Sequence, residues 1–154
     1  RGQVPVLRHG VPPEGGRTRR SRALMAQGAG GVAKAPTLTV AVLTKNEATR
    51  IDACLRSAAW ADQLIVIDSG STDATVERAR AAGAEVFVYP DWQGFAVQRT
   101  RQLQHVRCDY VFFLDADEVM SPAFRQELEG VVRSGSPAVW RRMFGFQRLV
   151  WWPK

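Results

Sequence analysis

Three carboxylates, Asp115, Asp117 and Glu118, stand on four consecutive residues directly after the apolar run 110–114. Carboxylates grouped in this way repel one another unless they share a cation. A set of oxygen ligands suits Mg²⁺ or Mn²⁺ better than zinc. The cluster therefore indicates a divalent ion that could bridge protein carboxylates to a diphosphate. The alternative is that Asp115 and Asp117 are solvated loop acids or charges at the start of a helix.

Two further polar segments, 44–47 (Thr-Lys-Asn-Glu) and 68–73 (Asp-Ser-Gly-Ser-Thr-Asp), each follow a short apolar run. An acid at the end of a buried strand can accept a hydrogen bond from a nucleobase N–H or a ribose hydroxyl. Asp68 is therefore a candidate binding residue. Asp73 and Ser71 lie closer to the next helix and suit its N-cap, because short polar side chains cap helix N-termini.

The elements that must position these segments alternate between strand and helix. Continuous apolar runs predict buried strands, and apolar residues at helical spacing predict helices. The expected strands are 38–43, 64–67, 86–89, 110–114 and one near 137–144, and the expected helices are 48–59, 73–82, 95–107 and 121–133. This order predicts an α/β fold with an open, mostly parallel sheet and helices on both faces. Ligands of such sheets bind beyond the carboxyl ends of the strands, where all three polar segments would meet.

Several common nucleotide and catalytic motifs are missing. The first strand is not followed by Gly-x-Gly-x-x-Gly, and the chain has neither a Walker A motif nor a Gly-x-Ser-x-Gly elbow.

Cys54 and Cys108 are isolated in apolar contexts and are expected to be buried, reduced thiols. His9 and His105 make no metal-ligand pattern.

The charge of the chain is unevenly distributed. The net charge of +6 arises from residues 1–36, which hold seven basic residues and one acid, whereas residues 37–135 hold ten basic residues and 14 acids. The first segment is rich in Gly and Pro and has no aromatic residue. We expect it to be a disordered, solvated tail, so the basic charge is weak support for a nucleic-acid partner. No apolar run approaches the ~20 residues of a membrane-spanning helix, and a secretory signal is not evident, so a cytoplasmic location is expected.

Together these segments resemble the inverting glycosyltransferases of family 2, which have the GT-A fold, a Rossmann-like nucleotide-sugar-binding domain. Residues 44–47 are similar to the family's first nucleotide-binding loop and residues 67–75 to its second. Asp115-Ala116-Asp117 matches its Asp-x-Asp motif, and residues 94–100 resemble its Gly…Ala-Arg-Asn segment. The positions that depart from the commoner family pattern are Leu43, Lys45, Gln98 and Thr100.

The resemblance implies a UDP-sugar donor and a divalent cofactor, Mg²⁺ or Mn²⁺. It implies that Asp68 contacts uracil or ribose, that Asp115 faces the ribose or the metal, and that Asp117 ligates the metal on the diphosphate. The donor-binding residues implied in this way are Thr44, Asn46, Glu47, Asp68, Gln98, Arg99 and Asp115.

A narrower resemblance is to the branch that builds the lipopolysaccharide core. The segments that carry it are 44–47, Ala61-Asp62, 68–73, Trp92-x-Gly94-Phe95 with Gln98, and 115–118. This branch transfers a hexose, typically glucose, to a saccharide of the inner core. It implies a saccharide or lipid-linked saccharide acceptor and peripheral contact with the inner membrane. The candidates for that contact are Trp140, Phe144, Phe146, Trp151 and Trp152, interleaved with Arg141, Arg142, Arg148 and Lys154. The alternative is that these residues face the core and are left exposed by truncation.

Family 2 enzymes also need a general base after the Asp-x-Asp motif, yet the sequence has no Asp or Glu after Glu129. We therefore expect a disordered tail (1–36), a donor-binding domain (37–135) and the start of a truncated acceptor-side region (136–154), with the base beyond Lys154. Glu118 and Asp91 are weaker candidates for the base. The alternatives are a non-catalytic nucleotide-sugar-binding fragment and a nucleotidyltransferase. The latter would need a Gly-rich, basic loop after the first strand.

Overall fold

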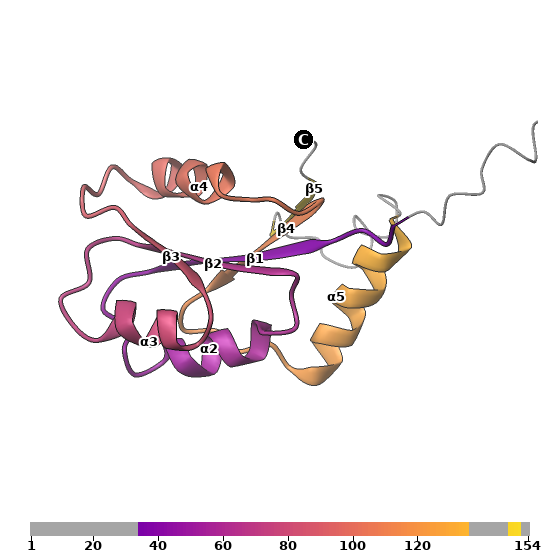
Figure 1. Ribbon diagram of the computed structural model, residues 1–154, viewed down its shortest axis with the longest axis horizontal. Coiled ribbons are helices and arrows are strands. Elements are labelled where there is room, and N and C mark those ends of the chain that lie inside the picture. Colours follow the sequence, from indigo (N-terminus) through magenta and orange to yellow (C-terminus); the bar gives the residue numbers. More distant parts are fainter. Residues whose placement is uncertain (1–33, 136–147, 152–154) are drawn as a thin grey trace, which may run out of the picture. The chain divides into compact units, whose positions relative to one another are not determined.

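The computed structural model describes residues 34–135 and 148–151, and all of its elements lie in the unit Ala35–Lys154. The strands are β1 (Leu38–Thr44), β2 (Gln63–Asp68), β3 (Glu85–Val88), β4 (Tyr110–Asp115) and β5 (Leu149–Trp151). The helices are α2 (Ile51–Ala58), α3 (Thr75–Ala81), α4 (Phe95–Gln104) and α5 (Pro122–Ser134) (Figure 1).

One sheet of order β3-β2-β1-β4-β5 carries these elements. β1 pairs in parallel with β2 and β4, and β2 pairs in parallel with β3. β5 pairs antiparallel with β4 at one edge. The predicted α/β fold with a mostly parallel sheet is confirmed. The sequence analysis missed β5, which has only three residues.

Helices cover both faces of this sheet, as predicted (Figure 1). Val40, Val42 and Val66 face a core shared with α2, α3 and α5, whereas Ala41 and Ile65 face the side of α4. Side chains of a strand alternate between its faces, so strands buried on both faces read as continuous apolar runs. This alternation explains why the β1, β2 and β4 runs were recognisable in the sequence.

Helix α4 differs from its prediction. The apolar pattern of residues 95–107 predicts a helix that buries Phe95, but Phe95 is 72% exposed. The residues that α4 buries completely are Gln98 and Gln102. Leu103 and Val106 do pack against the sheet as expected. Polar side chains therefore lie between α4 and the sheet at the end where the strands finish.

Two of the three predicted helix-end signals are confirmed. Ser121 caps α5 by accepting a hydrogen bond from the Phe124 amide at 3.1 Å, with Pro122 in the first turn. Gly83 follows α3 with φ of +85°, the left-handed conformation expected of a glycine terminator. The N-cap of α3 is Ala74 and not Asp73 or Ser71, so that prediction is wrong; Asp73 precedes the cap and accepts from the Thr75 amide at 3.0 Å.

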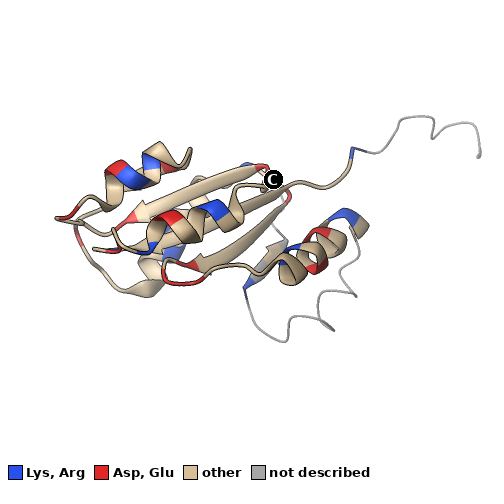
Figure 2. Ribbon diagram, turned by 90° about the horizontal axis from the view of Figure 1, so that it is seen from below, with Lys and Arg blue, Asp and Glu red and all other residues tan. Residues whose placement is uncertain are grey.

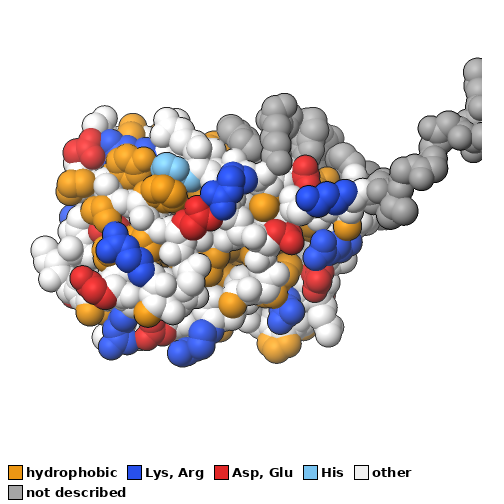
Figure 3. Space-filling model, viewed as in Figure 1, with side chains coloured by type: hydrophobic (Ala, Val, Ile, Leu, Met, Phe, Trp, Pro, Cys, Tyr) orange, Lys and Arg blue, Asp and Glu red, His pale blue; other side chains and the backbone are white. Residues whose placement is uncertain are grey.

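Charged side chains of both signs are interspersed on the face shown in Figure 3. Figure 2 shows acidic residues where strands end and in the loops that follow. No helix within residues 34–135 and 148–151 is long and apolar enough to cross a membrane. The predicted strand near 137–144 and nearly all of the tail 1–36 lie outside the described residues. So does most of the aromatic and basic segment 140–154.

Replacing Ser121 tests the helix cap. We expect Ser121→Ala to lower the free energy of unfolding by about 1 kcal/mol, because the Phe124 amide loses its acceptor. Urea denaturation would measure the change. Ser121→Asp, which retains a capping oxygen, should stay within a few tenths of a kcal/mol of the wild type. Equal stability of the Ala variant would show that the cap is not stabilising.

Candidate functional site

A cleft of about 590 Å³ lies where the strands end. Its lining comes from the ends of β1, β2 and β4, from the loop after β3 and from α4. The lining residues are Leu43, Thr44, Lys45, Glu47, Ser69, Trp92, Phe95, Arg99, Asp115, Ala116 and Asp117. Five of the eight predicted site residues line it: Thr44, Glu47, Arg99, Asp115 and Asp117. The position agrees with the general rule for open α/β sheets.

Thr44 carries a polar group with no partner in the described part of the chain. Its side chain is 3% exposed, and its Oγ1 is buried without a hydrogen bond. Burying a hydroxyl without a partner costs stability, so such a group in a cleft wall is well suited to a ligand atom. The backbone oxygen of Thr44 accepts from the Ser69 amide at 2.9 Å, which joins the ends of β1 and β2.

Asn46 fixes the loop after β1 to the loop after β2. Its backbone has a positive φ of 54°. Its backbone amide donates to Ser71 Oγ at 2.8 Å, and its side-chain Oδ1 accepts from the Thr72 backbone amide at 2.8 Å. Asn46 is predicted to bind the donor, but the structure places it as a clamp between two loops. Its role toward a ligand stays a prediction.

Asp68 lies behind the cleft. It is fully buried, and its carboxylate accepts from the amides of Gly70 and Ser71 at 2.9 and 2.8 Å and from Ser71 Oγ at 2.5 Å. These contacts shape the loop that follows β2. The neighbouring residue, Ser69, lines the cleft. The predicted contact of Asp68 with a nucleoside stays untested, and the structure shows its carboxylate engaged within its own loop.

Gln98 joins α4 to the cleft-lining residue Ser69, which follows β2. It is fully buried, and its Nε2 donates to Ser69 Oγ at 2.7 Å. Its Oε1 accepts from Arg101 at 2.9 Å. Gln98 is predicted to bind the donor; in the structure its side chain contacts Ser69, which lines the cleft, and its role toward a ligand stays a prediction. The sequence analysis did not select Ser69, since its only signal is that it follows Asp68.

An aromatic pair forms one rim of the cleft. The rings of Trp92 and Phe95 meet edge to face with centroids 5.0 Å apart, and the side chains are 47% and 72% exposed. Arg101 holds their loop through hydrogen bonds to the backbone and the carboxylate of Asp91, at 3.1 and 2.6 Å. The aromatic side chains at this rim are therefore exposed, and Arg101 holds the loop before them in place.

Two cations line the cleft. Arg99 lies 4.1 Å above the ring of Phe113, a cation–π contact. Burial lowers the pKa of Arg99, while the charge of Asp115 opposes that shift. Lys45, which the sequence analysis noted only as a departure from the family pattern, is exposed at the opening. Cations beside acids suit a ligand that carries both phosphate and metal.

The Asp115–Glu118 turn closes the cleft on the side of β4. The Glu118 amide donates to the Asp115 oxygen at 3.0 Å, and the Asp115 amide donates to Glu118 Oε2 at 3.1 Å. Beneath the turn, Cys54 donates its thiol to the Asp115 oxygen at 3.4 Å. Burial and then the charges of Glu118, Asp117 and Asp115 raise the pKa of Cys54 to about 12, so the thiol stays protonated. Cys54 and Cys108 are both free and buried, as predicted.

The carboxylates that line the cleft suit a divalent ion that is shared with a ligand. Within residues 34–135 and 148–151, no group of three or more His, Cys, Asp or Glu side chains could hold a metal by itself. Mg²⁺ is usually bound through one or two carboxylates together with substrate phosphates. Asp117 and Asp115 on the cleft wall, with cations nearby for the remaining phosphate charge, fit that mode of binding.

Residues 39–152 match the sequence profile of the family described as "Glycosyl transferase family 2". The chain belongs to glycosyltransferase family 2. An uncharacterized glycosyltransferase from Rickettsia bellii is 39% identical over 94 residues, which cover 60% of this chain and 32% of the relative. The lipopolysaccharide core biosynthesis glycosyltransferase LpsC of Rhizobium meliloti is 30% identical over 109 residues, covering 68% of this chain and 40% of LpsC.

Solved glycosyltransferases share the fold. Glucosyl-3-phosphoglycerate synthase from Mycobacterium tuberculosis, solved with Mn²⁺, UDP and glucosyl-3-phosphoglycerate, aligns with a TM-score of 0.54 and 31% identity over 64% of this chain and 40% of that one. Mannosyltransferase PcManGT from Pyrobaculum calidifontis, solved with GDP-Man and Mn²⁺, aligns with a TM-score of 0.58 and 26% identity over 68% and 34%. The predicted GT-A fold is thus confirmed. The chain spans about a third of the length of the first relatives it matches.

Replacing Asp68 tests whether its carboxylate stabilises the loop after β2. We expect Asp68→Asn to lower the free energy of unfolding by about 1–3 kcal/mol, because three donors face a buried side chain that then has one acceptor oxygen. Urea denaturation measures this. Asp52→Asn, at an exposed ion pair with Arg78, should change stability by less than about 1 kcal/mol. Unchanged stability of Asp68→Asn would contradict the loop-forming role.

Proposed function

We propose that this chain binds the donor in a glycosyltransferase that moves a hexose from a UDP-sugar to a saccharide acceptor. The observation that carries the proposal is the cleft itself. It joins the unpartnered hydroxyl of Thr44, the cations Lys45 and Arg99, and the acids Asp115 and Asp117. A nucleoside diphosphate sugar offers hydroxyl, phosphate and metal-binding groups that match these in kind. The solved relatives with UDP or GDP-Man and Mn²⁺ support the same use of the fold.

In this proposal Asp117 holds Mg²⁺ or Mn²⁺, and Asp115 faces the ribose or the metal. The ion would neutralise charge on the departing diphosphate, a Lewis-acid contribution. The residues of this chain bind and orient the donor, which contributes proximity to the reaction. Thr44 supplies a hydroxyl, Arg99 and Lys45 face phosphate charge, and Ser69, held by Gln98, contacts the nucleoside.

The finer features of the proposal come from the relatives. The similarity to LpsC, a lipopolysaccharide core biosynthesis glycosyltransferase, supports a saccharide acceptor of that core, and glucose is the proposed hexose. Such an acceptor is carried on a lipid, so peripheral contact with the inner membrane belongs to the same proposal. Direct displacement at the anomeric carbon would invert its configuration.

Neither weaker candidate for the general base is set up for proton transfer. A hydrogen bond from Arg101 holds the pKa of Asp91 below its usual value. Burial alone would raise the pKa of Glu118, but the hydrogen bonds from Arg148 and the Asp115 amide outweigh it and lower that pKa. Both carboxylates are already ion-paired with arginine. We propose that the base lies elsewhere in the protein, beyond Lys154.

A second candidate function is binding of the nucleotide sugar without transfer. It is favoured by the arginine pairing of Asp91 and Glu118. Transfer of labelled glucose from UDP-glucose to a core saccharide would distinguish the two. Binding without turnover favours the second candidate.

Removing the proposed metal ligand tests the proposal. We expect Asp117→Ala to weaken UDP binding in saturating Mn²⁺ by about 10-fold or more, and to leave binding in EDTA unchanged. Isothermal titration calorimetry measures both. Glu127→Ala removes an equal charge from an exposed site on α5 and should bind as the wild type does. If wild type and Asp117→Ala bind UDP equally well in Mn²⁺, the metal assignment is wrong.

The Thr44 hydroxyl gives a prediction of opposite sign for stability and binding. We expect Thr44→Val to leave stability unchanged or slightly raised, because it removes a buried hydroxyl that has no partner. UDP affinity should fall by about 3–10-fold, the equivalent of one hydrogen bond. Thermal denaturation and calorimetry on the same sample measure the two effects. A loss of stability with unchanged affinity would contradict the role of Thr44 in binding.

A further inference from the structure

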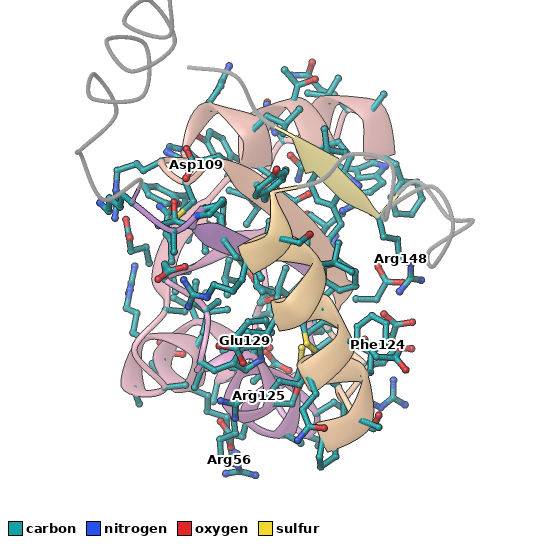
Figure 4. All side chains as sticks on the ribbon, turned by 90° about the vertical axis from the view of Figure 1, so that its right-hand side faces the viewer. Arg56, Asp109, Phe124, Arg125, Glu129 and Arg148 are labelled. Carbon is teal, nitrogen blue, oxygen red and sulfur yellow. The ribbon has the colours of Figure 1, made fainter. Side chains whose placement is uncertain are left out.

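Arg148 bridges both ends of the Asp115–Glu118 turn. One guanidinium nitrogen lies 3.1 Å from Asp115 Oδ2, and another lies 2.5 Å from Glu118 Oε2. Arg148 stands just before β5, 33 residues after Asp115. In Figure 4, Arg148 lies on the same side of the structure as Phe124 of α5. A residue from a later part of the chain therefore contacts the turn that carries Asp117.

Glu118 does more than pair with Arg148. The same Oε2 atom accepts from the Asp115 amide at 3.1 Å, and the Glu118 amide donates to the Asp115 oxygen at 3.0 Å. The turn is thus closed by two reciprocal hydrogen bonds, and Arg148 holds the carboxylate that makes one of them. Displacing the Glu118 carboxylate would remove the acceptor of the Asp115 amide and alter the direction of the residues after it.

The contact also directs Glu118 away from the cleft. Glu118 and Arg148 line a second cavity of about 500 Å³, whereas Asp115 and Asp117 line the donor cleft. The other residues of the second cavity are Phe112, Leu114, Val119, Met120, Ser121 and Phe124. The turn is therefore a wall between two cavities, with Glu118 held on the far side from Asp117.

The backbone at Arg148 is itself anchored. The Phe113 amide donates to the Arg148 oxygen at 2.8 Å, and β5 continues in register with Tyr110–Phe112 of β4. The side chains of Arg148, Glu118 and Asp115 are 41%, 38% and 49% exposed. Ion pairs this exposed add only about 0–1 kcal/mol to stability. The geometry of the bridge matters more to the turn than its contribution to folding.

We propose that Arg148 is a positioning residue for the metal-binding turn, which it holds in the shape that receives the metal-bound donor. The inference rests on the proposed function, because it assumes that Asp117 and Asp115 meet a metal nucleotide. Pre-ordered carboxylates bind more tightly, since the complex then forms without ordering them. Groups that orient metal ligands from outside usually change metal affinity by about 10–100-fold when they are removed.

A purely electrostatic role makes a different prediction. A guanidinium beside the turn repels a metal cation, so removing it would tighten metal binding. Removing the negative charge of Glu118 would weaken metal binding. A positioning role predicts that both losses weaken binding, because either one breaks the same bridge. Arg148→Gln and Glu118→Gln change the charge in opposite directions and therefore separate the two roles.

The experiment uses the 154-residue chain, with UDP titrated by calorimetry in saturating Mn²⁺ and in EDTA, and Mn²⁺ binding followed by electron paramagnetic resonance. We expect Arg148→Gln and Glu118→Gln each to weaken UDP binding in Mn²⁺ by about 10-fold, with binding in EDTA unchanged. Arg148→Lys should recover only part of the loss, because an ammonium lacks the planar fork that spans two carboxylates. Melting temperatures should match the wild type.

Arg107→Gln is the matched control. Arg107 makes an equally close two-point ion pair with Glu85 at the start of β3, away from the cleft. It should bind UDP in Mn²⁺ as the wild type does. Opposite effects of Arg148→Gln and Glu118→Gln, or no effect of either, would overturn the positioning role. So would equal losses in Mn²⁺ and in EDTA, which would indicate general damage to the cleft. A different result would contradict the proposed function itself: UDP binding by the wild-type protein that does not depend on metal.

Discussion

The parallel pairing of β1 with β2 on one side and β4 on the other is the constraint on which the candidate site depends. Its register sets Thr44 beside Asp68 and Leu43 beside Asp115. Three loops that are far apart in the sequence therefore begin in one row across the sheet. Because parallel strands all end at the same edge, the polar residues that follow them face one cleft. A shift in either register would separate the carboxylates from the nucleotide-binding loops.

Behind that row lies a second set of polar residues whose partners are within the protein. Asp68 shapes its own loop, Asn46 clamps two loops together, and Gln98 orients Ser69. Asp68 and Gln98 are fully buried, and buried polar groups of this kind are stable only when their hydrogen bonds are complete. The cleft wall therefore combines satisfied supports with one hydroxyl, that of Thr44, left unpartnered among the described residues. That contrast favours a wall prepared for a polar ligand.

The sequence predicted the fold well because burial leaves a direct pattern. Strands buried on both faces read as apolar runs, and Ser121 and Gly83 marked helix ends through their capping chemistry. It predicted the location of the site for the same reason, since the polar segments follow those runs. It did not separate the residues that face the cleft from those that support it. Asp68 and Ser69 are adjacent, polar and buried, and only the turn of the backbone decides which one lines the cleft. Arg148 was predicted only as a candidate for membrane contact, and its ion pairs with Asp115 and Glu118 were not predictable because they depend on a three-residue strand at the edge of the sheet.

The central claim is that a metal nucleotide binds at the carboxyl ends of β1, β2 and β4. The most direct measurement is the paramagnetic broadening of backbone amide NMR signals by Mn²⁺ in the presence of UDP, with Mg²⁺ as the diamagnetic reference. We predict the strongest broadening at Asp115–Glu118, then at Thr44 and Ser69, and the weakest at Thr37 and Asp109, beyond the opposite ends of the strands. Broadening centred on those opposite ends, or broadening that is the same without UDP, would contradict the account.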